Sequence, residues 1–141
     1  MKKTINIILL ILWMIFIFKM SGFNASESSG QSSIIVDFIT KILNIQNTEI
    51  ITFIIRKLAH ITEYFILAIL SYNVFKDYKI KNIFIITILF CTFYACTDEI
   101  HQMFIPGRSG NIIDVLIDGF GSLCGVIFYK NLKKLQKSTG I

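Results

Sequence analysis

The sequence predicts an all-α protein, a polytopic membrane helix bundle with four transmembrane helices and one short interfacial helix on the outer side. Hydrophobic residues make up 54% of the 141 residues and charged residues only 16%, against about 45–50% and about 25% in soluble domains. The apolar residues are concentrated in runs long enough to cross a bilayer core of about 30 Å. The single proline, Pro106, leaves most of the chain free to form long helices. At this length we expect one membrane domain over residues 1–141.

The first expected helix covers residues 4–20 and follows two lysines. A basic start and a short apolar run also fit a cleaved signal peptide. Cleavage after Ala25, however, places Phe23 at a position that favours small residues. We therefore favour an uncleaved helix, and with either fate the chain after it lies outside the cell.

A short amphipathic segment follows a loop rich in serine and glycine. Over residues 34–45, apolar side chains recur at helical spacing between Asp37, Thr40, Lys41 and Asn44. The segment is too short and too polar to cross a bilayer, so we expect a helix on the membrane surface. A lid packed on the helix bundle is the alternative, and the sequence favours neither.

The other three expected helices cover residues 52–75, 82–103 and 112–129. Pro106 and Gly107 follow the end of the third helix, since proline cannot continue a helix and glycine suits a turn. Asn111 is placed to cap the fourth helix. Gly121 and Gly125 lie four residues apart, which permits close packing against another helix.

Basic residues are distributed unevenly over the two sides of such a bundle. The side with both chain termini holds Lys2, Lys3, Lys76, Lys79, Lys81, Lys130, Lys133, Lys134 and Lys137. The other side, with its helix flanks, holds Lys19, Lys41, Arg56, Lys57 and Arg108. The positive-inside rule therefore predicts a multi-pass protein of a cell membrane with both termini in the cytoplasm. Topology also accounts for the net charge of +5, so no nucleic-acid partner is expected.

This orientation places the polar parts of three helices at one depth, near the outer leaflet. A charged group that faces lipid unpaired costs about 2.5–3.5 kcal/mol on insertion scales, so we expect these parts to face each other and form a pocket. The candidate pocket residues are Arg56, His60, Glu63, Tyr64, Asp98, Glu99, His101, Gln102, Arg108, Asp114 and Asp118. Lys57 is expected only to extend to the membrane interface. A purely structural pair between Arg56 and Asp114 is the simpler alternative.

Two kinds of ligand fit these residue types. Arg56, Arg108 and the histidines can bind a phosphate or pyrophosphate, for which arginine has the matching bidentate geometry. Weak candidates for a metal site are His60, Glu63, Asp98 and His101. No His-Glu-x-x-His run is present, and the two arginines oppose a cation, so we predict neither a metal nor a cofactor.

The same residues carry a resemblance to a known family. The runs are Arg56-Lys57-x-x-His60-x-x-Glu63-Tyr64, Asp98-Glu99-x-His101-Gln102-x-Phe104-x-Pro106-Gly107-Arg108 and Asp114-x3-Asp118-x2-Gly121. Together they resemble the VanZ-like family, over residues 10–129. One departure is Asp118, where the family more often carries Asn. The resemblance implies a small bacterial multi-helix membrane protein of the cell envelope, in a family named for a protein linked to teicoplanin resistance. It implies no known reaction.

Three functions follow as hypotheses. The first is an envelope protein whose pocket binds an anionic lipid-linked cell-wall intermediate or a lipoglycopeptide, and which contributes to glycopeptide (teicoplanin) antibiotic resistance. The second is a membrane-embedded hydrolase or transferase that acts on a lipid-linked phosphate through His60, His101, Asp98 and Glu99, so enzymatic activity is left open. The last is a proton-coupled transporter, since carboxylates within a membrane suit proton relay. The expected partners are membrane lipids, and the oligomeric state is not predicted.

Overall fold

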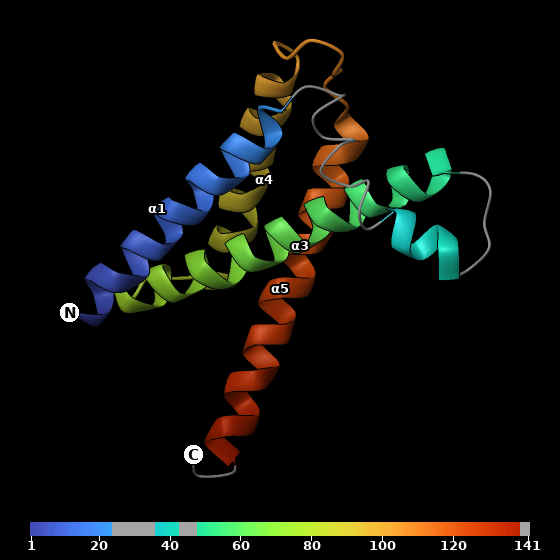
Figure 1. Cartoon of the computed structure of the whole chain (residues 1–141). Coiled ribbons are helices and arrows are strands. Elements are labelled where there is room, and N and C mark those ends of the chain that lie inside the picture. The colour runs from blue at the N-terminus through green and yellow to red at the C-terminus, as the bar shows by residue number, and fades with distance from the viewer. Residues whose placement is uncertain (24–35, 43–47, 139–141) are drawn as a thin grey trace.

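The computed structural model describes residues 1–23, 36–42 and 48–138, and the secondary structure of these residues is helical (Figure 1). Its long helices are α1 (Lys2–Ser21), α3 (Thr48–Asp77), α4 (Ile83–Gln102) and α5 (Ile112–Ser138). By length and composition, α1, α4 and α5 are apolar enough to cross a membrane. The all-α class is thus confirmed, and three of the four expected spanning helices have the length and composition to cross a membrane. Helix α3 is longer, but it carries ionisable residues in its middle turns.

The helix ends differ from expectation mainly in α3 and α5. Helix α3 begins at Thr48 rather than at residue 52. Helix α5 ends at Ser138 rather than at residue 129, because its lysine-rich end continues the helix. Lysine, leucine and glutamine are good helix formers, and no proline or glycine interrupts them before Gly140.

Part of the expected surface helix is visible. Residues 36–42 are helical, with Val36 buried and Phe38 and Ile42 exposed. Residues 34–35 and 43–45, the rest of that expected helix, lie outside the described part of the chain.

Helix α3 crosses the bundle obliquely and packs most extensively on α5 (Figure 1). The contact depends on two glycines of α5. A Cβ atom on Gly121 would lie 2.5 Å from the carbonyl oxygen of Ile61, and one on Gly125 would lie 2.4 Å from that of Phe65. These distances are too short for any side chain, so the two backbones touch. The close packing predicted from the glycine spacing is confirmed.

Helix α1 is attached to α3 and α4 by side chains that donate to backbone carbonyls. Trp13 Nε1 donates to Glu63 O at 2.9 Å, and Tyr94 Oη donates to Met14 O at 2.6 Å. Since a helix in lipid gains little from hydrophobic burial, such bonds and close packing hold the bundle together.

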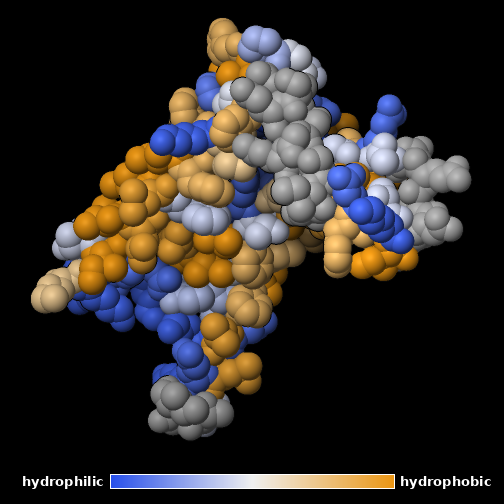
Figure 2. Space-filling view, viewed as in Figure 1, coloured by the Kyte–Doolittle hydropathy of each residue, from blue (hydrophilic) through white to orange (hydrophobic). Residues whose placement is uncertain are grey.

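The polarity of the bundle is that of a protein surrounded by lipid. Its outer surface exposes long apolar side chains, and Figure 2 shows them along the flank that contains α1. Small polar side chains, including Ser71, Thr87 and Ser122, are fully buried between helices. At the end that carries the N-terminus, Asn6 Nδ2 donates to Asp77 Oδ2 at 2.6 Å and fixes α1 to the end of α3.

Candidate functional site

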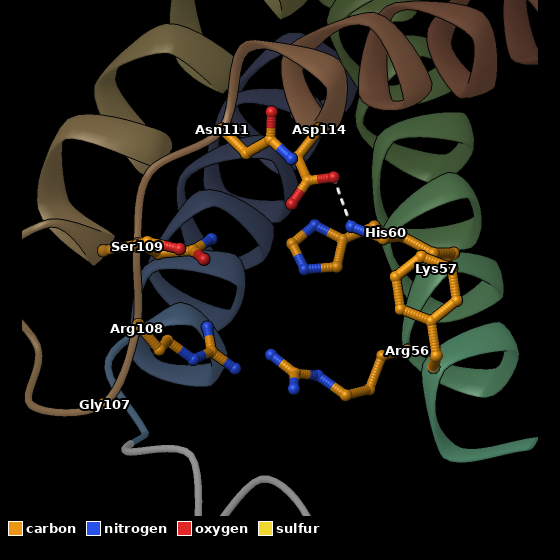
Figure 3. A pocket seen from close by; sticks show the side chains of 10 residues that line it. Arg56, Lys57, His60, Gly107, Arg108, Ser109, Asn111 and Asp114 are labelled. Carbon is orange, nitrogen blue, oxygen red and sulfur yellow. Dashed lines mark hydrogen bonds and ion pairs between the residues drawn. The ribbon is translucent and has the colours of Figure 1, made fainter. Parts of the chain in front are cut away.

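A cavity of ≈ 250 Å³ lies between the first half of α3 and the loop from α4 to α5 (Figure 3). Its lining consists of Phe53, Arg56, Lys57, His60, Gln102, Gly107, Arg108, Ser109, Asn111 and Asp114. Of the residues predicted from sequence, the structure thus brings together Arg56, His60, Gln102, Arg108 and Asp114 in one cavity. They come from α3, α4, the connecting loop and α5.

The loop presents Arg108 through a tight turn. Arg108 N donates to Ile105 O at 3.1 Å, and Gly107 has φ 77°, a value that side chains rarely allow. Proline at the second position and glycine at the third are the residues that a type II turn requires. Arg108 Nη1 also donates to Ser21 O at 3.0 Å, so the C-terminal end of α1 helps to hold the guanidinium.

The two arginines of the chain reach into the cavity from different elements, as Figure 3 shows. Within the described residues, Arg56 forms no hydrogen bond or ion pair. Burial and the nearby charge of Arg56 lower the pKa of Arg108. Two guanidinium groups directed into one cavity repel each other, and an anion between them converts that repulsion into attraction.

Lys57 and Asp114 form an ion pair at the edge of the cavity (Figure 3). From its position, Lys57 was expected only to extend to the membrane interface, and a structural pair between Arg56 and Asp114 was the alternative to a pocket. The expectation for Lys57 is wrong and the alternative does not hold, since Lys57 pairs with the carboxylate and Arg56 is directed into the cavity. The Lys57 ammonium also lies 5.1 Å from the centre of the Phe53 ring, which favours its position.

Three predicted carboxylates lie behind the cavity wall rather than on it, and we call Asp98, Glu99 and Asp118 the inner acidic layer. They are 2%, 5% and 0% exposed. Each is next to a residue that lines the cavity. Asp98 Oδ2 accepts from Gln102 Nε2 at 3.2 Å, and Glu99 Oε2 accepts from the backbone N–H of Asn111 at 2.8 Å. The inner acidic layer therefore orients parts of the wall.

Asp118, the third residue of the inner acidic layer, lies on α5 and is next to His60 of α3. His60 Nδ1 lies 3.4 Å from Asp118 Oδ1. The distance allows an ion pair, and neither atom has a hydrogen-bond partner in the described residues.

The remaining predicted residues do not line the cavity. Glu63 is close enough to His60 and Asp98 to interact with them electrostatically. Tyr64 is fully buried, and its hydroxyl has no partner among the described residues. His101 stacks on Phe18 of α1, with ring centres 4.0 Å apart. The structure therefore assigns the two histidines to different places, one at the cavity and one against α1.

The weak metal candidates do not form a compact ligand set. Within residues 1–23, 36–42 and 48–138, no group of three or more His, Cys, Asp or Glu side chains is placed to hold a metal ion. The wall that faces the cavity is instead dominated by nitrogen donors, which suits an anion.

Five wall residues were not predicted from the sequence: Phe53, Lys57, Gly107, Ser109 and Asn111. Phe53 shares a helix face with Arg56 and His60, since it lies three and seven residues before them, so its spacing carried a usable signal. Asn111 was predicted only as a cap. That role is confirmed, because its Oδ1 accepts from the N–H of Ile113 at 3.0 Å. Nothing in the sequence marks Ser109.

Comparison with curated proteins gives no match, and comparison with solved structures gives none. A family model described as VanZ/LLP1 matches residues 6–133 of the chain. The matched range contains every residue of the cavity wall and of the inner acidic layer.

Proposed function

Because the chain belongs to the VanZ/LLP1 family, as its three sequence runs predicted, we propose that it is a cell-envelope membrane protein that binds an anionic phosphate group in its cavity. The observation that carries the proposal is the convergence of Arg56 and Arg108 on one small cavity. A guanidinium presents several N–H groups in one plane, which matches the oxygens of a phosphate. His60 and Ser109 provide further polar groups on the same wall.

The size of the cavity favours a head group over a whole antibiotic. Pockets that enclose drug-sized ligands measure about 300–1,000 Å³, and this cavity measures ≈ 250 Å³. A phosphate or diphosphate at the end of a lipid fits that space, whereas a lipoglycopeptide does not. Any contribution to teicoplanin resistance then acts through a lipid-linked wall intermediate and not through enclosure of the drug.

We also propose that α3 is a fourth membrane crossing, with both termini cytoplasmic and the cavity on the outer side. Nine lysines on one side of the bundle support this orientation. The charged residues in the middle of α3 are compatible with a crossing, because Arg56 and Lys57 line the cavity. The side chains exposed on the outer face of the same turns, Ile54 and Leu58, are apolar. An outer site is where phosphate groups of lipid-linked wall precursors are found.

Binding measurements on the full chain in lipid nanodiscs test the proposal. The probes are phosphatidic acid in the disc and inorganic pyrophosphate in solution. Hydrogen bonds to charged groups contribute about 1.5–3 kcal/mol, so Arg56→Ala and Arg108→Ala should each weaken binding by about 10- to 150-fold. Arg56→Lys keeps the charge but loses the bidentate geometry, and should fall between.

The matched control is Lys134→Ala, which removes an exposed cation near the end of α5 and away from the cavity. It should bind as the wild type does. Equal retention of both probes by the wild type and by Arg56→Ala refutes the proposed function.

A further inference from the structure

Asp118 is not explained by anion binding. Its carboxylate is fully buried, and neither oxygen has a hydrogen-bond partner in the described part of the chain. A carboxylate behind the wall repels an anion in the cavity. Leaving such a group buried without a hydrogen bond also destabilises the fold. Its position, 3.4 Å from His60, indicates a role that acts through this histidine.

His60 separates the carboxylate from the cavity. Its ring projects into the cavity in Figure 3, and its Nδ1 is the nitrogen beside Asp118. Nε2 is then the nitrogen left to act on a ligand. A carboxylate 3.4 Å from Nδ1 favours a proton on Nδ1, which leaves the free electron pair on Nε2, as in a general base.

We propose that the cavity hydrolyses a terminal phosphate, with His60 as the general base and Asp118 as its positioning residue; this rests on the proposed function. His60 Nε2 takes a proton from a water molecule, and the oxygen of that water forms a bond to phosphorus. The bond between phosphorus and the leaving oxygen breaks, and that oxygen takes the proton from Nε2. Arg56 and Arg108 neutralise the charge on the other phosphate oxygens. The products are inorganic phosphate and an alcohol, or a shortened phosphate if the substrate is a diphosphate.

The two arginines define the substrate class. A terminal phosphate has three non-bridging oxygens and a charge of about −1.5 to −2. A phosphodiester has two such oxygens and one charge, so it cannot satisfy two bidentate guanidiniums equally well. We therefore expect lipid phosphate monoesters and terminal lipid diphosphates to be substrates, and phosphodiester lipids not to be.

Phosphate release from the full chain in nanodiscs tests the inference. The lipid arm uses phosphatidic acid, the soluble arm uses glycerol 3-phosphate, and the diester arm uses phosphatidylglycerol. We expect release with phosphatidic acid and none with phosphatidylglycerol. If glycerol 3-phosphate is hydrolysed with the same kcat/KM as phosphatidic acid, the hydrolysis is confirmed but the substrate is a soluble phosphate ester and not a lipid. Positioned general bases contribute about 10²- to 10⁴-fold, so His60→Gln should lower kcat by that factor.

The role of Asp118 is tested by kcat and KM together. Asp118→Ala should lower kcat at least about tenfold and leave KM within about threefold, since it acts on the base and not on the ligand. Asp118→Asn keeps an acceptor oxygen and similar volume, and it should recover part of the loss and preserve the fold. The matched controls are Asp77→Ala and Asp77→Asn, which remove a carboxylate bonded to Asn6 at the far end of α3, and they should keep wild-type kcat.

Two results overturn the inference while leaving the proposed function intact. One is a wild-type protein that binds phosphatidic acid but releases no phosphate. The other is a kcat for His60→Gln or Asp118→Ala that equals that of the Asp77 controls. A wild-type protein that binds neither phosphatidic acid nor pyrophosphate in the same nanodiscs refutes the proposed function instead.

Discussion

Gly121 connects the stability of the bundle to the geometry of the cavity. The glycine lies three residues after Asp118 on α5, and it packs against the carbonyl of Ile61, the residue after His60 on α3. Gly121→Ala places a methyl group 2.5 Å from that oxygen, whereas ordinary contact begins at 3.4 Å. The substitution therefore forces α3 and α5 apart beside the His60–Asp118 pair.

The magnitude follows from this distance. Restoring ordinary contact requires a separation of about 0.9 Å, and overpacking of a tight interface costs about 1–3 kcal/mol. Replacing a helical glycine with alanine returns about 0.5–1 kcal/mol, so we expect a net loss of stability of about 0–2.5 kcal/mol, centred on about 1 kcal/mol. The same separation moves His60 Nδ1 and Asp118 Oδ1 from 3.4 Å to beyond about 4 Å, outside ion-pair distance.

Thermal unfolding in detergent, followed by circular dichroism, measures the first effect, and phosphate release from nanodiscs measures the second. Gly119→Ala is the matched control, because a Cβ there meets only Thr92 Oγ1 at 3.9 Å. Gly125→Ala is a second control, equally tight against Phe65 O but one turn further from the cavity. We expect both Gly121→Ala and Gly125→Ala to unfold earlier than Gly119→Ala, and Gly121→Ala to lose more activity. Gly121→Ala and Gly119→Ala proteins of equal stability refute the reasoning.

Lys57→Met leaves the Asp114 carboxylate unpaired at the cavity edge. Its repulsion should weaken phosphate binding about threefold or more. The loss of stability should be only about 0–1 kcal/mol, because the pair is partly exposed. Adding Asp114→Asn should restore affinity in the nanodisc titration, and failure to do so contradicts the repulsion. Tyr94→Phe removes the donor to α1 and should lower the free energy of unfolding by about 0.5–1.5 kcal/mol in detergent titrations; an unchanged midpoint shows that the bond contributes nothing. A reporter enzyme that is active only in the cytoplasm should be active when it is fused after Lys79, in the turn between α3 and α4. Activity of a reporter that works only outside the cell, fused at the same residue, refutes the orientation.

Several features of the fold could be predicted because they depend on neighbouring residues in the chain. Apolar runs of bilayer length specify spanning helices in any context. Pro106 and Gly107 form a turn because of their own backbone preferences, and Asn111 caps α5 because its side chain reaches an N–H two residues ahead. The spacing of Gly121 and Gly125 similarly predicts one bare stripe on a helix. These interactions are local, so the sequence contains them in full.

Tertiary structure alone decided which polar groups meet. Helical spacing places side chains on one face, but it does not give the tilt of that face or its distance from a neighbouring helix. The close contact at Gly121 and the oblique path of α3 place His60 at the cavity. The same packing turns His101 toward Phe18 and gives Asp114 to Lys57 rather than to Arg56. Small displacements between tightly packed helices select one partner over another, because hydrogen bonds and ion pairs weaken steeply over about 1 Å.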